Sequence, residues 1–182
     1  MPYKIGVVAP YPELSQLCHE ISTGFSDIIM IYEGIFNSGV QQALKAQRWG
    51  AEVIISRGAT ADAIRKHVEI PVVDVLTDDC DLLKALHEAC RWGNRLAIVT
   101  SRRLLFEKDL LEGLLGVKLQ QFIFNERDHL QQVIAHVKNE GCQVVVGGIY
   151  TVYLAERLGL QGVLVRSGRE AILRALSEAR SI

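Results

Sequence analysis

The sequence predicts an α/β protein made of two similar lobes, each with a parallel β-sheet and helices on both of its faces. One observation is that short runs of branched apolar residues, such as Val53-Ile54-Ile55, alternate with longer segments of helical periodicity. Strands that alternate with helices in this way form parallel sheets covered on both sides. The other observation is that the 182-residue sequence matches itself when shifted by 91 residues, half of its length.

The repeat is one of pattern, because few identities survive in it. Val53-Ile54-Ile55 falls on Val144-Val145-Val146, Lys4 to Ala9 falls on Arg95 to Thr100, Thr60 falls on Thr151, and Val72-Val73 falls on Val163-Leu164. Any alternating α/β chain matches itself at some offset. The absence of gaps over several elements nevertheless favours two related lobes.

The first half is expected to hold four strands and three helices before the chain leaves it. The strands are Tyr3 to Ala9, Asp27 to Tyr32, Val53 to Ile55 and Pro71 to Val75, and the helices are Glu13 to Ser22, Ile35 to Trp49 and Ala59 to His67. The first strand ends at Pro10-Tyr11-Pro12, because proline cannot continue a hydrogen-bonded ladder.

A helix carrying Leu82, Leu86 and Ala89 follows Thr77-Asp78-Asp79. Threonine or aspartate before an apolar periodic run is typical of a helix N-cap, and carboxylates suit the positive end of a helix. A catalytic pair of acids is the alternative interpretation of these aspartates, and the helix start explains them without chemistry.

The second half repeats this order. Its strands are Arg95 to Thr100, Val117 to Phe124, Cys142 to Val146 and Gly162 to Val165, and its helices are Arg103 to Leu115, Asp128 to Asn139, Tyr150 to Leu158 and a last one opened by Ser167-Gly168-Arg169-Glu170. The helix from Arg103 is expected to present Leu104, Leu105, Leu111 and Leu115.

Composition argues against several classes of function. The net charge is −1 and no basic stripe occurs, so this segment is not expected to contact nucleic acid. No apolar run approaches the roughly 20 residues that span a bilayer, and no export signal is evident, so a cytoplasmic location is expected. The four cysteines form no C-x-x-C pair, and His87 with Cys90 supplies at most half of a metal site. We therefore expect no metal.

Nucleotide and catalytic motifs are also missing. No P-loop and no G-x-G-x-x-G run is found, so no cofactor is expected. Ser56 stands where a phospho-accepting receiver needs an aspartate, the loops lack the cysteines of a two-lobed racemase, and no G-x-S-x-G elbow occurs.

A ligand site is expected in a cleft between the lobes, because ligands of open α/β sheets lie beyond the carboxyl ends of the strands. The candidate ligand-binding residues are Pro10, Tyr11, Ser56, Arg57, Gly58, Ala59, Thr60, Thr100, Ser101, Gly147, Gly148, Tyr150, Ser167 and Gly168. These loops offer hydroxyls, glycines and an arginine. They hold no Cys, His, Asp or Glu that could attack or accept a proton, which favours binding over catalysis.

Arg57 is the central candidate within this set. It follows a buried strand and precedes a helix whose first N–H groups are free, a combination that suits a carboxylate or phosphate. A solvated turn residue is the plainer interpretation of Arg57.

The run Ile54-Ile55-Ser56-Arg57-Gly58-Ala59-Thr60, with Ile64-Arg65 and Ile70-Pro71-Val72-Val73, resembles the N-terminal sensor domain of propionate-catabolism activators, which are sigma-54-dependent transcription regulators. The resemblance covers nearly the whole chain. It implies two Rossmann-like lobes, residues 1–77 with 168–182 and residues 78–167, with the helix from Asp78 crossing to the second lobe and the last helix returning to the first. It also implies an organic-acid effector, 2-methylcitrate in one branch, and downstream AAA+ ATPase and helix-turn-helix modules. ATPase activity is expected only in the downstream AAA+ module and not in this segment.

One departure bears on the effector. The second lobe has Gly147-Gly148 where the first has Ser56-Arg57, so a single cation is evident, although Arg166 or Arg169 could assist. Two alternatives stay open. One is a two-lobed synthase or isomerase that uses Asp74 or Glu33, and the other is a dimerisation module with an empty cleft. A homo-oligomer is compatible with each.

Overall fold

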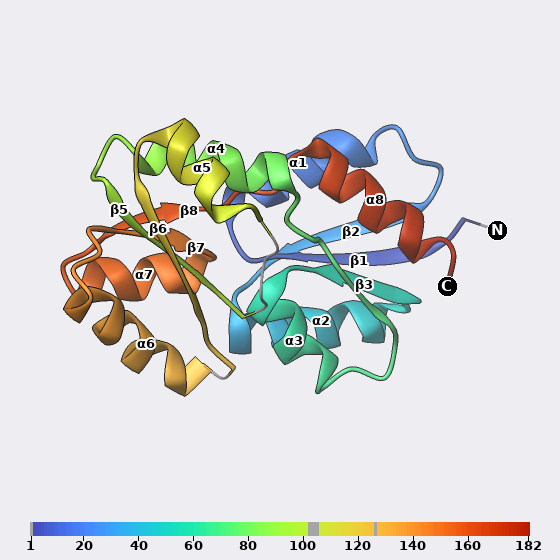
Figure 1. Ribbon diagram of the computed structural model, residues 1–182. Coiled ribbons are helices and arrows are strands. Elements are labelled where there is room, and N and C mark those ends of the chain that lie inside the picture. The colour runs from blue at the N-terminus through green and yellow to red at the C-terminus, as the bar shows by residue number, and fades with distance from the viewer. Residues whose placement is uncertain (1, 102–105, 126) are drawn as a thin grey trace. The chain divides into compact units, whose positions relative to one another are not determined.

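A computed structural model describes residues 2–101, 106–125 and 127–182 (Figure 1). The elements strictly alternate, as the sequence predicts. The strands are β1 (Lys4–Ala9), β2 (Ile28–Glu33), β3 (Val53–Ser56), β4 (Val72–Asp74), β5 (Arg95–Thr100), β6 (Lys118–Ile123), β7 (Val144–Gly147) and β8 (Gln161–Leu164). The helices are α1 (Pro12–Ser22), α2 (Phe36–Trp49), α3 (Gly58–Arg65), α4 (Asp79–Ala89), α5 (Lys108–Leu115), α6 (Arg127–Asn139), α7 (Ile149–Arg157) and α8 (Arg169–Ala179).

The strands form two separate parallel sheets of the same topology. One 4-stranded sheet has the order β2-β1-β3-β4, and the other has the order β6-β5-β7-β8. All pairings within both sheets are parallel. The predicted α/β class with two similar, Rossmann-like lobes is confirmed.

The chain divides into two compact units. Unit 1 comprises Met1–Asp78 and Ser167–Ile182, and unit 2 comprises Asp79–Arg166. The chain therefore passes from one unit to the other twice. As a result α4, which follows the first sheet in sequence, packs on β7 and β8 of unit 2, and α8 packs on β3 and β4 of unit 1.

The central strands of each sheet are buried on both faces, which explains why their middle residues are apolar, whereas the edge strands β2 and β6 are mostly exposed or half-buried. In unit 1 the side chains of Val8, Ile54 and Ile64 pack with α2 on one face. In unit 2 one cluster lies beneath α4, and a second lies beneath α6 and α7. Figure 1 shows helices on both sides of the sheet in each unit.

The inner strands obey the 91-residue repeat, whereas the outer strands depart from it. Ile5 pairs with Val53, and Leu96 pairs with Val144, as the repeat requires. Lys4, however, pairs with Ile28. Its counterpart Arg95 pairs with Lys118, one residue before the position that the repeat predicts.

The last strand shows the same slip. Ile54 pairs with Val72, but Val145 pairs with Gly162. The expectation of a match without gaps is therefore wrong at both sheet edges. A one-residue slip exchanges the two faces of a strand, so β2 and β6 do not present equivalent side chains.

The helix predicted from Arg103 begins later. Helix α5 starts at Lys108. Glu107 before it has an extended backbone, and Phe106 is not helical. Leu104 and Leu105 lie outside the described residues. The predicted helix to His67 ends earlier, at Arg65, where the N–H of Lys66 turns back to the carbonyl of Ala63.

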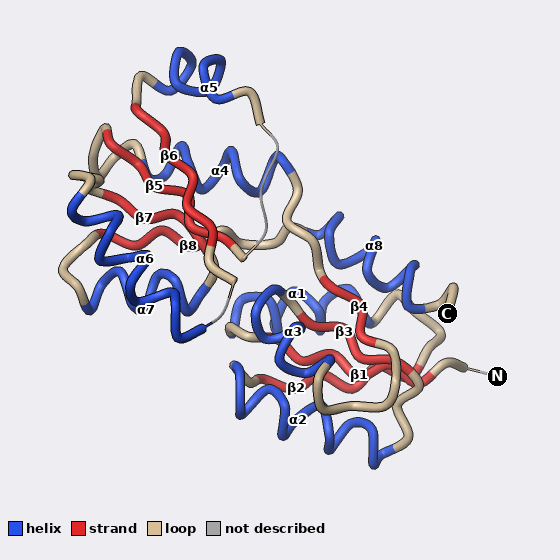
Figure 2. Tube along the Cα trace, turned by 60° about the horizontal axis from the view of Figure 1, so that its bottom comes forward, coloured by secondary structure: helices blue, strands red, loops and turns tan. Residues whose placement is uncertain are grey.

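The helices that follow β1 and β5 are anchored differently. Helix α1 buries Leu14, Ser15, Cys18 and Ile21, whereas α5 has no buried residue. In Figure 2, α5 leads directly into β6 at the edge of the unit-2 sheet. Among the described residues, no helix has the length and apolarity needed to cross a bilayer.

Candidate functional site

The carboxyl ends of β1, β3 and β4 lie along one edge of the unit-1 sheet, because these strands are parallel and adjacent. The residues that follow them are Pro10 and Tyr11 after β1, Arg57 and Gly58 after β3, and Val75 to Thr77 after β4. Parallel topology thus gathers segments that are far apart in the sequence.

Arg57 is the charged centre of this edge. It is 9% exposed. Its Nη1 donates to the Tyr11 hydroxyl at 2.6 Å, and its Nη2 donates to Thr77 Oγ1 at 3.0 Å. The guanidinium carbon also lies 5.6 Å from the centre of the Tyr11 ring. Within the described part of the chain, no carboxylate forms an ion pair with Arg57.

A buried cation without a counter-ion is unfavourable unless something compensates it. The hydroxyls of Tyr11 and Thr77 hold the guanidinium in one orientation but do not neutralise it. Further N–H donors of the guanidinium remain, and they can form the paired hydrogen bonds that a carboxylate or phosphate accepts.

Ser167 adds a second incompletely satisfied group. Its backbone N–H donates to the same Tyr11 hydroxyl at 3.0 Å. Its side chain is buried, and Ser167 Oγ has no hydrogen-bond partner among the described residues. The Tyr11 oxygen already accepts from Arg57 and from Ser167, so the hydroxyl's own proton can be donated to another acceptor.

Three further predicted ligand-binding residues form hydrogen bonds within unit 1. Ser56 Oγ donates to the carbonyl of Val8 at 2.8 Å, and Thr60 Oγ1 accepts from the N–H of Phe36 at 3.3 Å. Gly58 has a φ of +54°, which favours glycine, and its N–H donates to Asp74 Oδ1 at 3.0 Å. These residues fix the backbone around Arg57.

The unit-2 candidates lie at the equivalent sheet edge of their own unit. Thr100 ends β5, Gly147 ends β7, and Gly148 is the N-cap of α7. A Cβ on Gly147 would lie 2.6 Å from the Val99 carbonyl oxygen, so the backbone there is too close for any side chain. Tyr150 stacks on Tyr153 with ring centres 6.1 Å apart.

Ser101 follows β5 directly and is half-buried. The cleft between the lobes in which these residues were expected to meet stays a prediction. The remaining candidates Pro10, Ala59 and Gly168 are half-buried too. The helix N-termini at these edges have no side-chain cap from their N-cap residues, which are Tyr11 in α1, Arg57 in α3, Gly148 in α7 and Gly168 in α8.

No sequence pattern predicted the role of Thr77. The run Thr77-Asp78-Asp79 was expected to begin the next helix, and α4 begins at Asp79, but the Thr77 hydroxyl accepts a hydrogen bond from Arg57. Of the two possible assisting cations, Arg166 lies 3.6 Å from Glu88 in an ion pair, and Arg169 is exposed at the start of α8.

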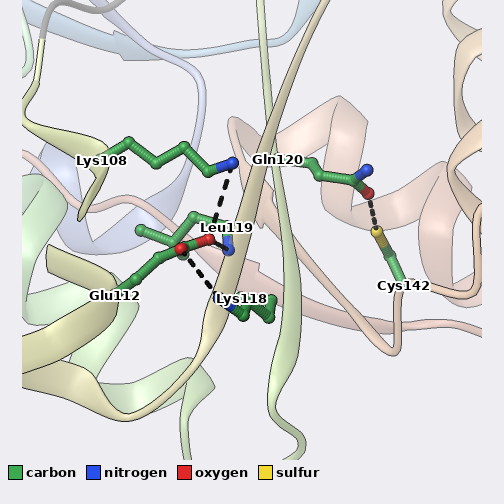
Figure 3. Close-up of polar contacts among 6 residues, drawn as sticks. All are labelled: Lys108, Glu112, Lys118, Leu119, Gln120 and Cys142. Atoms are coloured by element: carbon green, nitrogen blue, oxygen red, sulfur yellow. Dashed lines mark hydrogen bonds and ion pairs between the residues drawn. The ribbon is translucent and has the colours of Figure 1, made fainter.

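A separate polar cluster in unit 2 surrounds Glu112 (Figure 3). The Glu112 carboxylate accepts the N–H of Leu119 at 2.7 Å and lies 3.3 Å from Lys118 Nζ and 3.7 Å from Lys108 Nζ. The backbone hydrogen bond from Leu119, with the two lysines, holds the pKa of this carboxyl below its usual value. The cluster fastens α5 to β6.

A hollow of about 730 Å³ adjoins this cluster, lined by Asn94, Arg95, Asp109, Glu112, Gly113, Gly116, Val117 and Lys118. Arg95 and Lys118 are the first residues of β5 and β6, so the hollow lies at the amino end of that sheet. It is thus at the opposite end of the unit-2 strands from the predicted ligand-binding residues Thr100 and Gly147.

The surroundings of three cysteines make their thiols less reactive. Burial raises the pKa of Cys18 to about 12, and it also raises the pKa of Cys90 and of Cys142. The Cys142 thiol donates to Gln120 Oε1 at 3.1 Å (Figure 3). Raised pKa values keep these thiols protonated and poorly nucleophilic at neutral pH.

Known proteins resemble this chain at the level of sequence and of fold. A family model described as propionate catabolism activator matches residues 26–182. The crystal structure of an NtrC family transcriptional regulator from Clostridium acetobutylicum is 30% identical, and the alignment covers 100% of this chain and 96% of that one, with a TM-score of 0.90.

More distant structures include an aspartate racemase homologue from Pyrococcus horikoshii OT3, which is 17% identical over 97% of this chain and 99% of that one, with a TM-score of 0.38. Likeness at this level supports no conclusion about function. The family match extends over most of the chain, and the regulator from C. acetobutylicum matches all of it. The chain therefore belongs to the family of propionate catabolism activators.

Proposed function

We propose that this chain is the effector-sensing domain of a sigma-54-dependent transcription regulator and that its effector is a small organic acid. The family and the similarity to an NtrC family regulator support a regulatory domain. The observation that carries the choice of ligand is the buried Arg57, which two hydroxyls orient and for which the described residues provide no counter-ion.

A carboxylate satisfies this site in three ways. It supplies the missing negative charge, it can accept a pair of guanidinium N–H bonds, and its neighbouring oxygens can accept the protons of Tyr11 and Ser167. A tricarboxylate such as 2-methylcitrate offers additional acceptors for backbone N–H groups at the strand ends.

Binding becomes a signal only if the effector has different affinities for two conformations of the domain. In this proposal the bound acid favours one conformation, and the AAA+ ATPase of the full-length regulator responds to it. The alternative of a synthase or isomerase has less support, because its candidate Asp74 is engaged with the Gly58 N–H and Glu33 is exposed at the end of β2.

Calorimetric titration with 2-methylcitrate, citrate, tricarballylate and succinate tests the proposal. We expect heat with at least one of them and a loss of about 2–5 kcal/mol of binding free energy in Arg57→Gln, which corresponds to roughly 30-fold or more in Kd. The matched control is Arg65→Gln, because Arg65 is 43% exposed and paired with Asp62 at 2.7 Å. Absence of binding to every acid, or equal affinity in Arg57→Gln, would contradict the proposal.

A further inference from the structure

Hydrogen bonds link Arg57 to a residue beside each of the two passages of the chain between the units, directly to Thr77 and through Tyr11 to Ser167. One passage runs from Asp78 to Asp79, and the other runs from Arg166 to Ser167. Thr77, directly before the first passage, accepts a hydrogen bond from Arg57. Ser167, at the second passage, is joined to Arg57 through the Tyr11 hydroxyl.

Tyr11 links groups that are distant in the sequence. Its partners Arg57 and Ser167 are separated from it by 46 and 156 positions. Tyr11 itself is 4% exposed, so both hydrogen bonds form away from water. Hydrogen bonds in such surroundings are strong, and those that share one atom depend on each other.

A carboxylate on Arg57 must change this arrangement. A charged oxygen accepts hydrogen bonds from a guanidinium more strongly than a hydroxyl oxygen does, so an anion bound to the remaining Arg57 donors draws the guanidinium away from Tyr11 and Thr77. The Tyr11 proton then turns toward the anion, and the bond from the Ser167 N–H to the Tyr11 oxygen changes in length and direction.

We propose that the Tyr11 hydroxyl and Thr77 transmit the occupation of Arg57 to the two passages between the units, Tyr11 to the second and Thr77 to the first. The proposal rests on the proposed function, because it requires an anion at Arg57. It adds the route by which a local change of hydrogen bonds reaches the segments that connect the two units, as a ligand switch requires.

The test combines calorimetry with NMR of the 182-residue chain, with citrate as the probe. Calorimetry gives the affinity, while the amide signals of Ser167 and of residues 77–79 report on the two passages. In the unaltered chain these signals are expected to shift with the same saturation curve as the heat.

Tyr11→Phe removes the hydroxyl but keeps the ring beneath Arg57. We expect citrate to bind with its affinity reduced by roughly tenfold at most, and the response of the Ser167 amide to be lost. The matched control is Tyr153→Phe in unit 2. That hydroxyl accepts from Arg157 Nη1 at 3.2 Å, and the guanidinium carbon of Arg157 lies 5.7 Å from its ring, as in the Tyr11 pair.

The outcomes separate this inference from the proposed function. If Tyr11→Phe binds citrate and its Ser167 amide still responds as before, the relay is refuted and the sensing proposal stands. If the unaltered chain binds none of the acids, both are refuted. If Tyr11→Phe does not bind citrate at all, the amide responses of the Thr77→Val variant test the relay instead. Loss of the response of residues 78–79, with the Ser167 response kept, supports the relay, and an unchanged response of both passages refutes it.

Discussion

Ser56 in unit 1 and Gly147 in unit 2 occupy equivalent positions at the ends of β3 and β7, but their surroundings differ. Ser56 Oγ donates to the Val8 carbonyl at 2.8 Å. The counterpart of that carbonyl belongs to Val99, and it would lie 2.6 Å from a Cβ at Gly147. Unit 1 therefore has room for a hydroxyl between its two central strands, whereas the strand ends of unit 2 lie too close together for any side chain.

The following position extends the contrast. Unit 1 has the buried, hydroxyl-bound Arg57, and unit 2 has the exposed Gly148, around whose Cβ position no atom lies within 4 Å. One topology thus supports a charged, side-chain-rich edge in one unit and an edge of bare backbone in the other. The repeat therefore specifies the scaffold, and two positions at the end of one strand specify the chemistry.

The largest effect on stability is expected from Gly147→Ala. The added Cβ would contact the Val99 oxygen and Thr151, and the strand would have to move, at a cost of about 3 kcal/mol in the free energy of unfolding. Chemical denaturation measures it. Ser56→Ala is the matched variant, and it should cost only about 1 kcal/mol because it removes one hydrogen bond. Equal costs would show that the two strand ends do not differ.

Glu112→Gln tests how α5 is held, because its leucines Leu111 and Leu115 are only partly buried and the Glu112 carboxylate accepts the N–H of Leu119 in β6. The folded state depresses the pKa of Glu112 below its ordinary 4.5, so its contribution to stability is present above that pH and is lost on further acidification. Thermal unfolding across this range should show a weaker acid dependence in the variant. Glu52→Gln is the control, because Glu52 accepts a single exposed N–H bond from Lys4. An unchanged acid dependence in Glu112→Gln would contradict this role.

Ser167→Ala is expected to lower the affinity for citrate without lowering stability. Removal of a buried hydroxyl without a partner should leave the free energy of unfolding unchanged or raise it by about 1 kcal/mol. The affinity for citrate should fall several-fold if this hydroxyl contacts the acid. Ser56→Ala, whose hydroxyl is paired, should lose stability instead. Unchanged affinity in Ser167→Ala would remove Ser167 from the binding site.

The smallest effect is expected from Gly148→Arg. The φ of Gly148 is −76°, which any residue adopts, and the space around its Cβ position is open. The free energy of unfolding should change by no more than about 0.5 kcal/mol. The affinity for citrate should stay the same, because the described residues place no counterpart of Tyr11 or Thr77 in contact with this position. A second binding event in calorimetry would show that the cation alone is sufficient.

The order of the elements was predictable because it depends on local periodicity. Runs such as Val53-Ile54-Ile55 are long enough to mark a buried strand, and the structure places β3 there. The start of α5 was not predictable, since Leu104, Leu105 and Leu111 continue a helical pattern that Glu107 interrupts with an extended backbone.

The candidate site was predictable in part. Tyr11, Arg57 and Ser167 follow strand ends or precede helices, and this position alone marks them. Thr77 was missed because its hydroxyl serves a residue 20 positions away, which no local pattern records. Asp74 was considered for catalysis, and its bond to the Gly58 N–H depends equally on the pairing of β3 with β4.

The α/β alternation, the repeat of the inner strands and the residue types at the strand ends follow from the amino-acid sequence alone, because they depend on side-chain periodicity and turn chemistry. The one-residue slip of the outer strands and the hydrogen bonds that connect Arg57 with Tyr11, Thr77 and Ser167 depend on the folded structure. Register and long-range hydrogen bonds depend on how separate segments pack against each other, and this packing is a property of the folded chain as a whole.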